Sequence, residues 1–168
     1  RFFPDTGGVE SHVYEVARRL SGLGFRVAVL ATDNASTSVR QETVEGVRVV
    51  RVPALPRGRD WRYVRGIGRY LAAMRPDLVH VHSYHTFVAP QALAWATRRR
   101  VPRVLTFHAG GHSSGLRTAV RPAQQWALRP LLARASRLVV LSEWERDVYV
   151  KRLHLPPQLF ACIPNGAD

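Results

Sequence analysis

Apolar residues recur at helical spacing in several segments of the chain. The clearest segment starts at Glu10. Its apolar face comprises Val13, Val16, Ala17, Leu20 and Leu23, and Gly24 then supplies a C-terminal stop. The same spacing predicts helices over 61–75, 86–98 and 117–135. A further helix is predicted after Ser142, because Ser142 and Glu145 form a Ser-x-x-Glu capping box.

Short runs of valine and leucine separate these helices and predict buried strands. They lie at 26–32, 77–83, 103–108, 137–142 and 159–164. Residues 43–53 predict a short hairpin or edge strand that turns near Glu45 and Gly46. Continuous apolar strands that alternate with helices are typical of a parallel sheet. We therefore expect an α/β fold with a doubly wound, mainly parallel sheet and helices on both faces.

Length and composition fit one globular domain. Of the 168 residues, 46% are hydrophobic and 22% are charged, which argues against a disordered or fibrous chain. No run approaches the roughly 20 apolar residues of a membrane span, and no basic, apolar leader precedes the fold. We therefore expect a cytoplasmic protein. Cys162 is the only cysteine, so no intrachain disulfide can form.

The chain is strongly basic. It carries 25 basic and 12 acidic side chains, a formal net charge of +13, and Lys151 is its only lysine. This charge is typical of proteins that bind nucleic acid, anionic membrane surfaces or phosphorylated small molecules. The alternative is a compositional bias towards arginine, balanced by a more acidic remainder of the protein, because the arginines are spread over every predicted helix. The sequence leaves both explanations open.

Histidines gather where ligands bind in doubly wound sheets, at the carboxyl ends of strands. The residues that follow the predicted strands are 31–34, 83–85, 108–112 and Ser142. His80 and His82 lie two apart on one strand and share a face, and His85 lies just beyond. His108 ends another strand, where its imidazole can donate or accept a hydrogen bond. The alternative for His108 is a surface histidine at a strand end.

A zinc site on these histidines is a further interpretation. It needs a third or fourth ligand and supporting carboxylates, and only Asp77 lies nearby, at the opposite end of the strand. We therefore expect no metal site, and interpret His80 as a packed core or interface residue and His82 as a ligand contact. A metal-dependent hydrolase built on His80 and His82 would require stoichiometric zinc.

Gly7 and Gly8 immediately precede the first predicted helix. Glycine leaves backbone N–H groups unshielded and permits φ > 0, and a helix N-terminus attracts anions. The pair lacks the Gly-x-Gly-x-x-Gly spacing of dinucleotide-binding loops and the Gly-Lys-Ser/Thr of a P-loop. Taken in isolation, a tight turn before a helix explains the pair as well as a phosphate site does.

Five motifs follow one another along the chain. They are Gly-Gly-Val-Glu at 7–10, His-Val-His-Ser at 80–83, Thr-Phe-His-Ala-Gly-Gly at 106–111, Ser-Glu-Trp-Glu-Arg-Asp at 142–147 and Ile-Pro-Asn-Gly-Ala-Asp at 163–168. Each motif is loose alone, whereas the ordered set is specific. In this order and spacing, nearly the whole chain resembles the N-terminal Rossmann-like domain of retaining GT-B glycosyltransferases of the family 4, or group 1, type.

The resemblance implies roles for matching residues. It implies that Gly7 and Gly8 approach the diphosphate of a nucleotide-sugar donor, and that His108 lies at the catalytic centre near the transferred sugar. For the full protein it implies transfer of the sugar to an acceptor hydroxyl, with retention of anomeric configuration and without an essential metal or other cofactor.

Further roles concern the acceptor and the hinge between domains. The resemblance implies that the acceptor side is lined by Glu10, His82, Ser83 and Tyr84, and that the hinge comprises Asn165, Gly166 and Asp168. The family's first strand is missing ahead of Arg1, and no donor-binding domain follows the hinge. We therefore expect residues 1–163 to form the acceptor-side domain, truncated at its N-terminus, and residues 164–168 to begin the hinge to an absent domain. We expect the fragment alone to transfer no sugar.

Two function classes remain in view. As a transferase, the protein would bind a nucleotide-sugar donor and a sugar, lipid or small-molecule acceptor, and a lipid-linked acceptor would suit peripheral association with the inner face of an anionic membrane. The alternative is a non-catalytic basic module for nucleic acid or anionic membrane, with steep salt dependence. No RNP, helix-turn-helix or zinc-finger pattern supports the nucleic-acid form, so we expect no nucleic acid partner.

Overall fold

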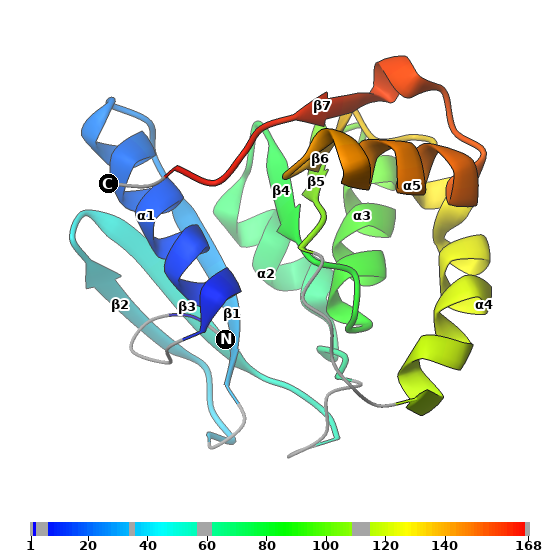
Figure 1. Cartoon of the computed structure of the whole chain (residues 1–168). Helices are drawn as coiled ribbons and strands as arrows, with labels where there is room; N and C mark the ends of the chain where they lie inside the picture. Colours follow the sequence, from blue (N-terminus) through cyan, green and yellow to red (C-terminus); the bar gives the residue numbers. More distant parts are fainter. Residues whose placement is uncertain (1, 3–6, 34–35, 57–61, 109–114, 167–168) are drawn as a thin grey trace. The chain divides into compact units, whose positions relative to one another are not determined.

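The computed structural model describes residues 2, 7–33, 36–56, 62–108 and 115–166, whose helices and strands are labelled in Figure 1. The chain divides into two compact units. The first comprises Arg1–Pro76 and His85–Val88, and the second comprises Asp77–Tyr84 and Ala89–Asp168. The expectation of one domain over residues 1–163 stays a prediction.

The described part of the first unit is built on a three-stranded sheet. Its elements are α1 (Gly8–Gly22), β1 (Ala28–Asp33), β2 (Arg40–Val44), β3 (Val47–Pro53) and α2 (Ile67–Met74). The strand order is β1-β3-β2, with β1 parallel and β2 antiparallel to β3. Glu45 and Gly46 connect β2 to β3 with φ values of 46° and 80°, which suits the twist of a tight hairpin. The predicted hairpin and its turn are confirmed.

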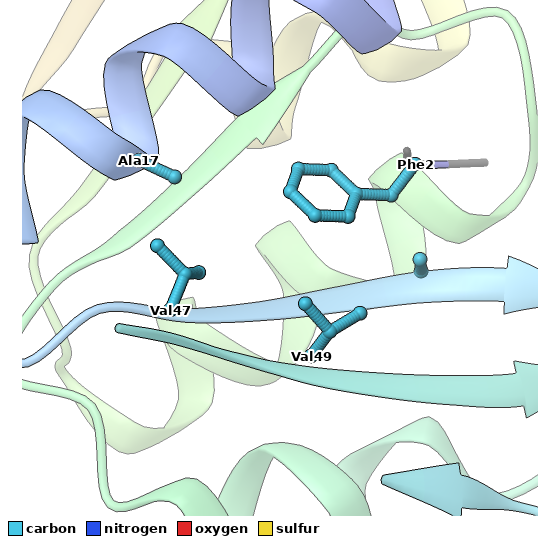
Figure 2. Packing of buried hydrophobic residues seen from close by; sticks show 5 residues of the cluster. Phe2, Ala17, Val47 and Val49 are labelled. Atoms are coloured by element: carbon cyan, nitrogen blue, oxygen red, sulfur yellow. The ribbon is translucent and has the colours of Figure 1, made fainter. Parts of the chain in front are cut away.

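The core of the first unit lies between α1 and this sheet. It comprises Phe2, Ala17, Ala31, Val47 and Val49. Figure 2 shows the Phe2 ring beside Val49 of β3, and Ala17 of α1 above Val47. The predicted first helix is confirmed, although it begins at Gly8 and ends at Gly22. Leu23 is its C-cap and is 74% exposed, so the apolar stripe stops one residue earlier than the spacing predicts.

Helix α2 is shorter than predicted. The spacing predicts a helix over 61–75, whereas α2 spans Ile67–Met74. Tyr63 forms a bridge to Leu55 through two backbone hydrogen bonds, of 2.8 and 3.0 Å, so its backbone groups are committed outside a helix. Gly66 then starts the helix with a left-handed backbone (φ 68°). The predicted start was wrong because a pairing distant in sequence holds the residues before Gly66 in place.

The second unit contains a parallel sheet. Its elements are β4 (Val79–His82), α3 (Val88–Arg99, whose first residue belongs to the first unit), β5 (Arg103–Thr106), α4 (Gly115–Leu132), β6 (Arg137–Val140), α5 (Glu143–Leu153), a 3₁₀ turn (Pro157–Leu159) and β7 (Phe160–Cys162). The strand order is β4-β5-β6-β7, and each neighbouring pair is parallel. The expected α/β fold class is confirmed by this four-stranded parallel sheet flanked by helices.

Helix α5 begins with the predicted capping box. The Ser142 hydroxyl accepts a hydrogen bond from the Glu145 N–H at 3.2 Å. The Glu145 carboxylate in turn accepts from the N–H of Leu141 at 2.8 Å, one residue earlier than in the usual box. Glu145 is buried, so these bonds hold the end of β6 to the start of α5.

None of the helices in the described ranges combines the length and the apolar character that a membrane span requires.

Candidate functional site

Three histidines lie along the carboxyl ends of β4 and β5. His82 is the last residue of β4 and is paired in register with Thr106, the last residue of β5. His80 precedes His82 by two residues and His108 follows Thr106 by two. Side chains two apart on a strand share a face. The sheet register therefore brings together histidines that are 26 residues apart in sequence.

The three imidazoles form a contiguous row. His82 Nδ1 lies 3.2 Å from His108 Nε2, within hydrogen-bond distance. The ring centroids of His80 and His82 are 4.1 Å apart, and those of His82 and His108 are 5.5 Å apart. His80 Nε2 is hydrogen-bonded to the Thr106 hydroxyl at 2.7 Å. We call His80, His82, His108 and Thr106 the histidine row.

Burial differs along the histidine row. His108 is only 7% exposed, which rules out the interpretation of a surface histidine at a strand end. Thr106 is buried as well, whereas His80 is exposed and is therefore not a packed core residue. The two imidazoles of His82 and His108 are fewer than the three protein ligands of a catalytic zinc, so this pair by itself is no zinc site. The expected absence of a metal stays a prediction.

The turn after β4 is held by specific hydrogen bonds. Ser83 has a left-handed backbone (φ 65°), unusual for a residue other than glycine, and its N–H donates to the Thr106 carbonyl at 2.9 Å. The next residue, Tyr84, is 2% exposed, and its ring packs edge-on against Phe107 and Tyr149. The Tyr84 side chain therefore serves the core, and acceptor contacts by Ser83 and Tyr84 stay predictions.

Two glutamines of α4 fix Tyr84. Gln125 Nε2 donates to the Tyr84 hydroxyl at 2.8 Å, and Gln124 Nε2 donates to the Tyr84 carbonyl at 2.9 Å. Neither glutamine was predicted from the sequence. Polar residues in an amphipathic helix are ordinarily solvent-facing, and nothing local marks Gln125 as buried.

The glycine pair lies at the start of α1. Gly7 is the N-cap, with extended backbone (φ −176°, ψ 162°), and Gly8 is the first helical residue. The left-handed conformation that glycine permits is therefore not used at Gly7. A Cβ on Gly7 would overlap Glu10 Oε2, whereas a Cβ on Gly8 would meet nothing within 4 Å. No side chain caps this helix. The roles of Gly7, Gly8 and Glu10 in substrate binding stay predictions.

The predicted hinge follows β7. The N–H of Ile163 donates to the Val140 carbonyl at 2.9 Å, and residues 163–166 have no regular secondary structure. Asn165 and Gly166 are exposed. Asp168 lies outside the described residues, as do residues 109–112. Hinge motion stays a prediction.

The lone cysteine has a perturbed thiol. Burial, and then a hydrogen bond to Glu143 with its negative charge, raise the pKa of Cys162. The thiol is thus protonated and weakly nucleophilic at neutral pH.

The sequence model described as Glycosyltransferase Family 4 matches residues 6–168, almost the whole chain. This chain belongs to glycosyltransferase family 4. The resemblance drawn from the ordered motifs is thereby confirmed, and the histidine row lies in two of those motifs.

Named relatives of this family 4 chain are transferases. It is 28% identical over 181 residues to the D-inositol 3-phosphate glycosyltransferase of Thermobispora bispora, covering 98% of this chain and 42% of that protein. It is 27% identical over 129 residues to the UDP-Gal:alpha-D-GlcNAc-diphosphoundecaprenol alpha-1,3-galactosyltransferase of Escherichia coli, covering 74% and 33%. It is 23% identical over 173 residues to a human phosphatidylinositol N-acetylglucosaminyltransferase polypeptide, covering 99% and 35%. The chain thus spans 33–42% of the length of these relatives.

Proposed function

We propose that the protein containing this chain transfers a sugar from a nucleotide-sugar donor to an acceptor hydroxyl, with retention of anomeric configuration. The observation that carries the proposal is the family 4 match over residues 6–168. The names of the relatives support it, since each denotes the transfer of a glycosyl group.

In this proposal His108 contacts the transferred sugar. Its place just beyond the carboxyl end of a parallel strand, where ligands of α/β sheets bind, supports the role. A buried imidazole held by His82 can present its other nitrogen to a sugar hydroxyl in a fixed orientation. Fixed donors and acceptors of this kind stabilise a transition state without reorganising as charge develops.

Gly7 and Gly8 would bind the donor diphosphate through backbone N–H groups at the start of α1. The uncapped N-terminus supports this role, because N–H groups and the helix dipole attract an anion. The Glu10 carboxylate lies against Gly7. Like charges repel, so we expect the Glu10 side chain to rotate away when a diphosphate binds. Neutralising the leaving diphosphate with N–H groups and cationic side chains needs no metal and no other cofactor.

The acceptor is proposed to carry a phosphate. The names of the three relatives denote acceptors with a phosphate, a diphosphate or a phosphatidyl group. The net charge of +13 would favour such an acceptor. A lipid-linked form would place the protein in the cytoplasm, at the inner face of an anionic membrane. Trp126 and Trp144, both more than two-thirds exposed, are suited to a membrane interface.

The test is transfer by the full-length protein with a panel of UDP-, GDP- and ADP-sugars. We expect turnover with one donor, the same anomer in donor and product, and no turnover by residues 1–168 alone. We expect His108→Ala to lower kcat about a hundredfold to a thousandfold, the loss typical of one fixed hydrogen-bond donor.

His154→Asn is the matched control. His154 is an exposed C-cap of α5 with a left-handed backbone that asparagine also adopts, so kcat should stay unchanged. Full activity of His108→Ala would contradict the role of His108. Absence of turnover on every donor, together with salt-sensitive binding to DNA duplexes or anionic vesicles, would favour the alternative of a non-catalytic basic module.

A further inference from the structure

The bond between His82 and His108 constrains the protons of both rings. A hydrogen bond between two imidazole nitrogens needs one N–H and one lone pair. The nitrogens concerned are Nδ1 of His82 and Nε2 of His108. If His82 donates, its proton is on Nδ1, and neutral His108 must carry its proton on Nδ1. If His108 donates, both neutral rings carry the proton on Nε2. The two neutral rings therefore share the same tautomer in either case.

This coupling reaches the other nitrogen of His108. With both rings in the Nδ1–H form, His108 Nδ1 is a hydrogen-bond donor. With both rings in the Nε2–H form, His108 Nδ1 is an acceptor. The state of His82 thus decides which kind of hydrogen bond His108 can make with a second group.

The surroundings hold His82 in one orientation. Its ring stacks at 4.1 Å on that of His80, which is hydrogen-bonded to Thr106 on the neighbouring strand. The Ser83 N–H is bonded to the Thr106 carbonyl, which fixes the backbone directly after His82. Tyr84 is buried and is bonded twice to α4. A turn held by so many contacts can sustain a left-handed serine that would otherwise cost free energy.

We infer that His82 is a positioning residue: it fixes the tautomer and the ring orientation of His108, in place of the direct acceptor contact that the sequence suggested for its side chain. The geometric part of this inference rests on the 3.2 Å bond alone. Its consequence for catalysis rests on the proposed function. The two parts are tested separately.

The geometric part is tested by NMR. Protein labelled with ¹⁵N-histidine and freed of metal by EDTA is measured at alkaline pH, where both rings are neutral, and two-bond ¹H–¹⁵N correlations assign the tautomer of each ring. We expect the same tautomer in His82 and His108, and a changed His108 signature in His82→Phe. His80→Phe keeps an aromatic ring beside His82 and should leave the His108 tautomer unchanged. Different tautomers in the two rings, or an unchanged His108 in His82→Phe, would overturn the inference.

The catalytic part is tested by kinetics of the full-length protein. We expect His82→Phe to lower kcat about tenfold to a hundredfold, the effect of removing a group that orients a functional histidine, with KM for the acceptor unchanged. His82→Asn places an amide near the position of Nδ1 and should recover most of the rate. A raised acceptor KM with unchanged kcat would show direct acceptor contact and overturn the positioning role. Absence of turnover by the unsubstituted protein would refute the proposed function, and the NMR result would still decide the pairing.

Discussion

The N-termini of α1 and α5 have similar sequences but are closed in different ways. Each helix has a glutamate at its third position, Glu10 in α1 and Glu145 in α5. In α5, Ser142 and Glu145 accept hydrogen bonds from N–H groups of the first turn and of the residue before the cap. In α1, the cap is Gly7 and no side chain caps the helix. One N-terminus is thus closed by its own side chains, and the other leaves its N–H groups to an external acceptor.

This difference shows how one residue separates a structural helix start from a candidate binding site. Serine at the cap supplies an acceptor from within the chain. Glycine supplies none and leaves the backbone accessible. The following predictions test this contrast in order of decreasing effect on stability.

Removal of the buried glutamate should have the largest effect on stability. Glu145→Ala leaves the Leu141 N–H without its carboxylate acceptor in a buried site, so we expect a loss of about 1–3 kcal/mol in the free energy of unfolding. Glu10→Ala is the control at the same helical position, and we expect a change within about 0.5 kcal/mol. Denaturant titration of both variants measures the difference. Equal losses would show that the two helix starts are closed alike.

A serine at the open N-terminus should change substrate binding more than stability. Gly7→Ser adds a potential cap, worth a few tenths of a kcal/mol, and a Cβ that displaces the Glu10 carboxylate. We expect KM for the nucleotide-sugar to rise about tenfold, the equivalent of one lost hydrogen bond to a charged group.

Gly22→Ala is the matched control for that variant. It lies at the other end of α1, where an added Cβ meets nothing within 4 Å. We expect stabilisation of about 0.5 kcal/mol and an unchanged KM. An unchanged KM in Gly7→Ser would contradict the proposed diphosphate site.

The smallest expected effect concerns the thiol beside α5. Glu143 contributes, after burial, to the raised pKa of Cys162, because a carboxylate disfavours the thiolate. Glu143→Gln should lower that pKa, increase the thiolate fraction at pH 8 and accelerate alkylation by iodoacetamide. Asp147→Asn, which removes a different acid of α5, should leave the alkylation rate unchanged. Equal rates in all three proteins would show that the first-turn acid of α5 has no effect on Cys162.

Features determined by neighbouring residues were predictable from the sequence. The turn at Glu45 and Gly46 needs left-handed backbone, and glycine at the second position indicates it. The cap at Ser142 is defined by a spacing of three residues. The start of α2 was not predictable, because the bridge between Leu55 and Tyr63 joins residues whose pairing no local pattern shows.

The candidate site was predicted in its members but not in its bonds. The sequence by itself determined the α/β class, the family, and the placement of His82 and His108 at strand ends, because strand periodicity and motif order are properties of the linear chain. Only the tertiary structure decided that Nδ1 of one ring meets Nε2 of the other, and that Gln124 and Gln125 hold the turn beside them. Those contacts depend on the register between β4 and β5 and on the packing of α4. Both are fixed by interactions between residues far apart in sequence.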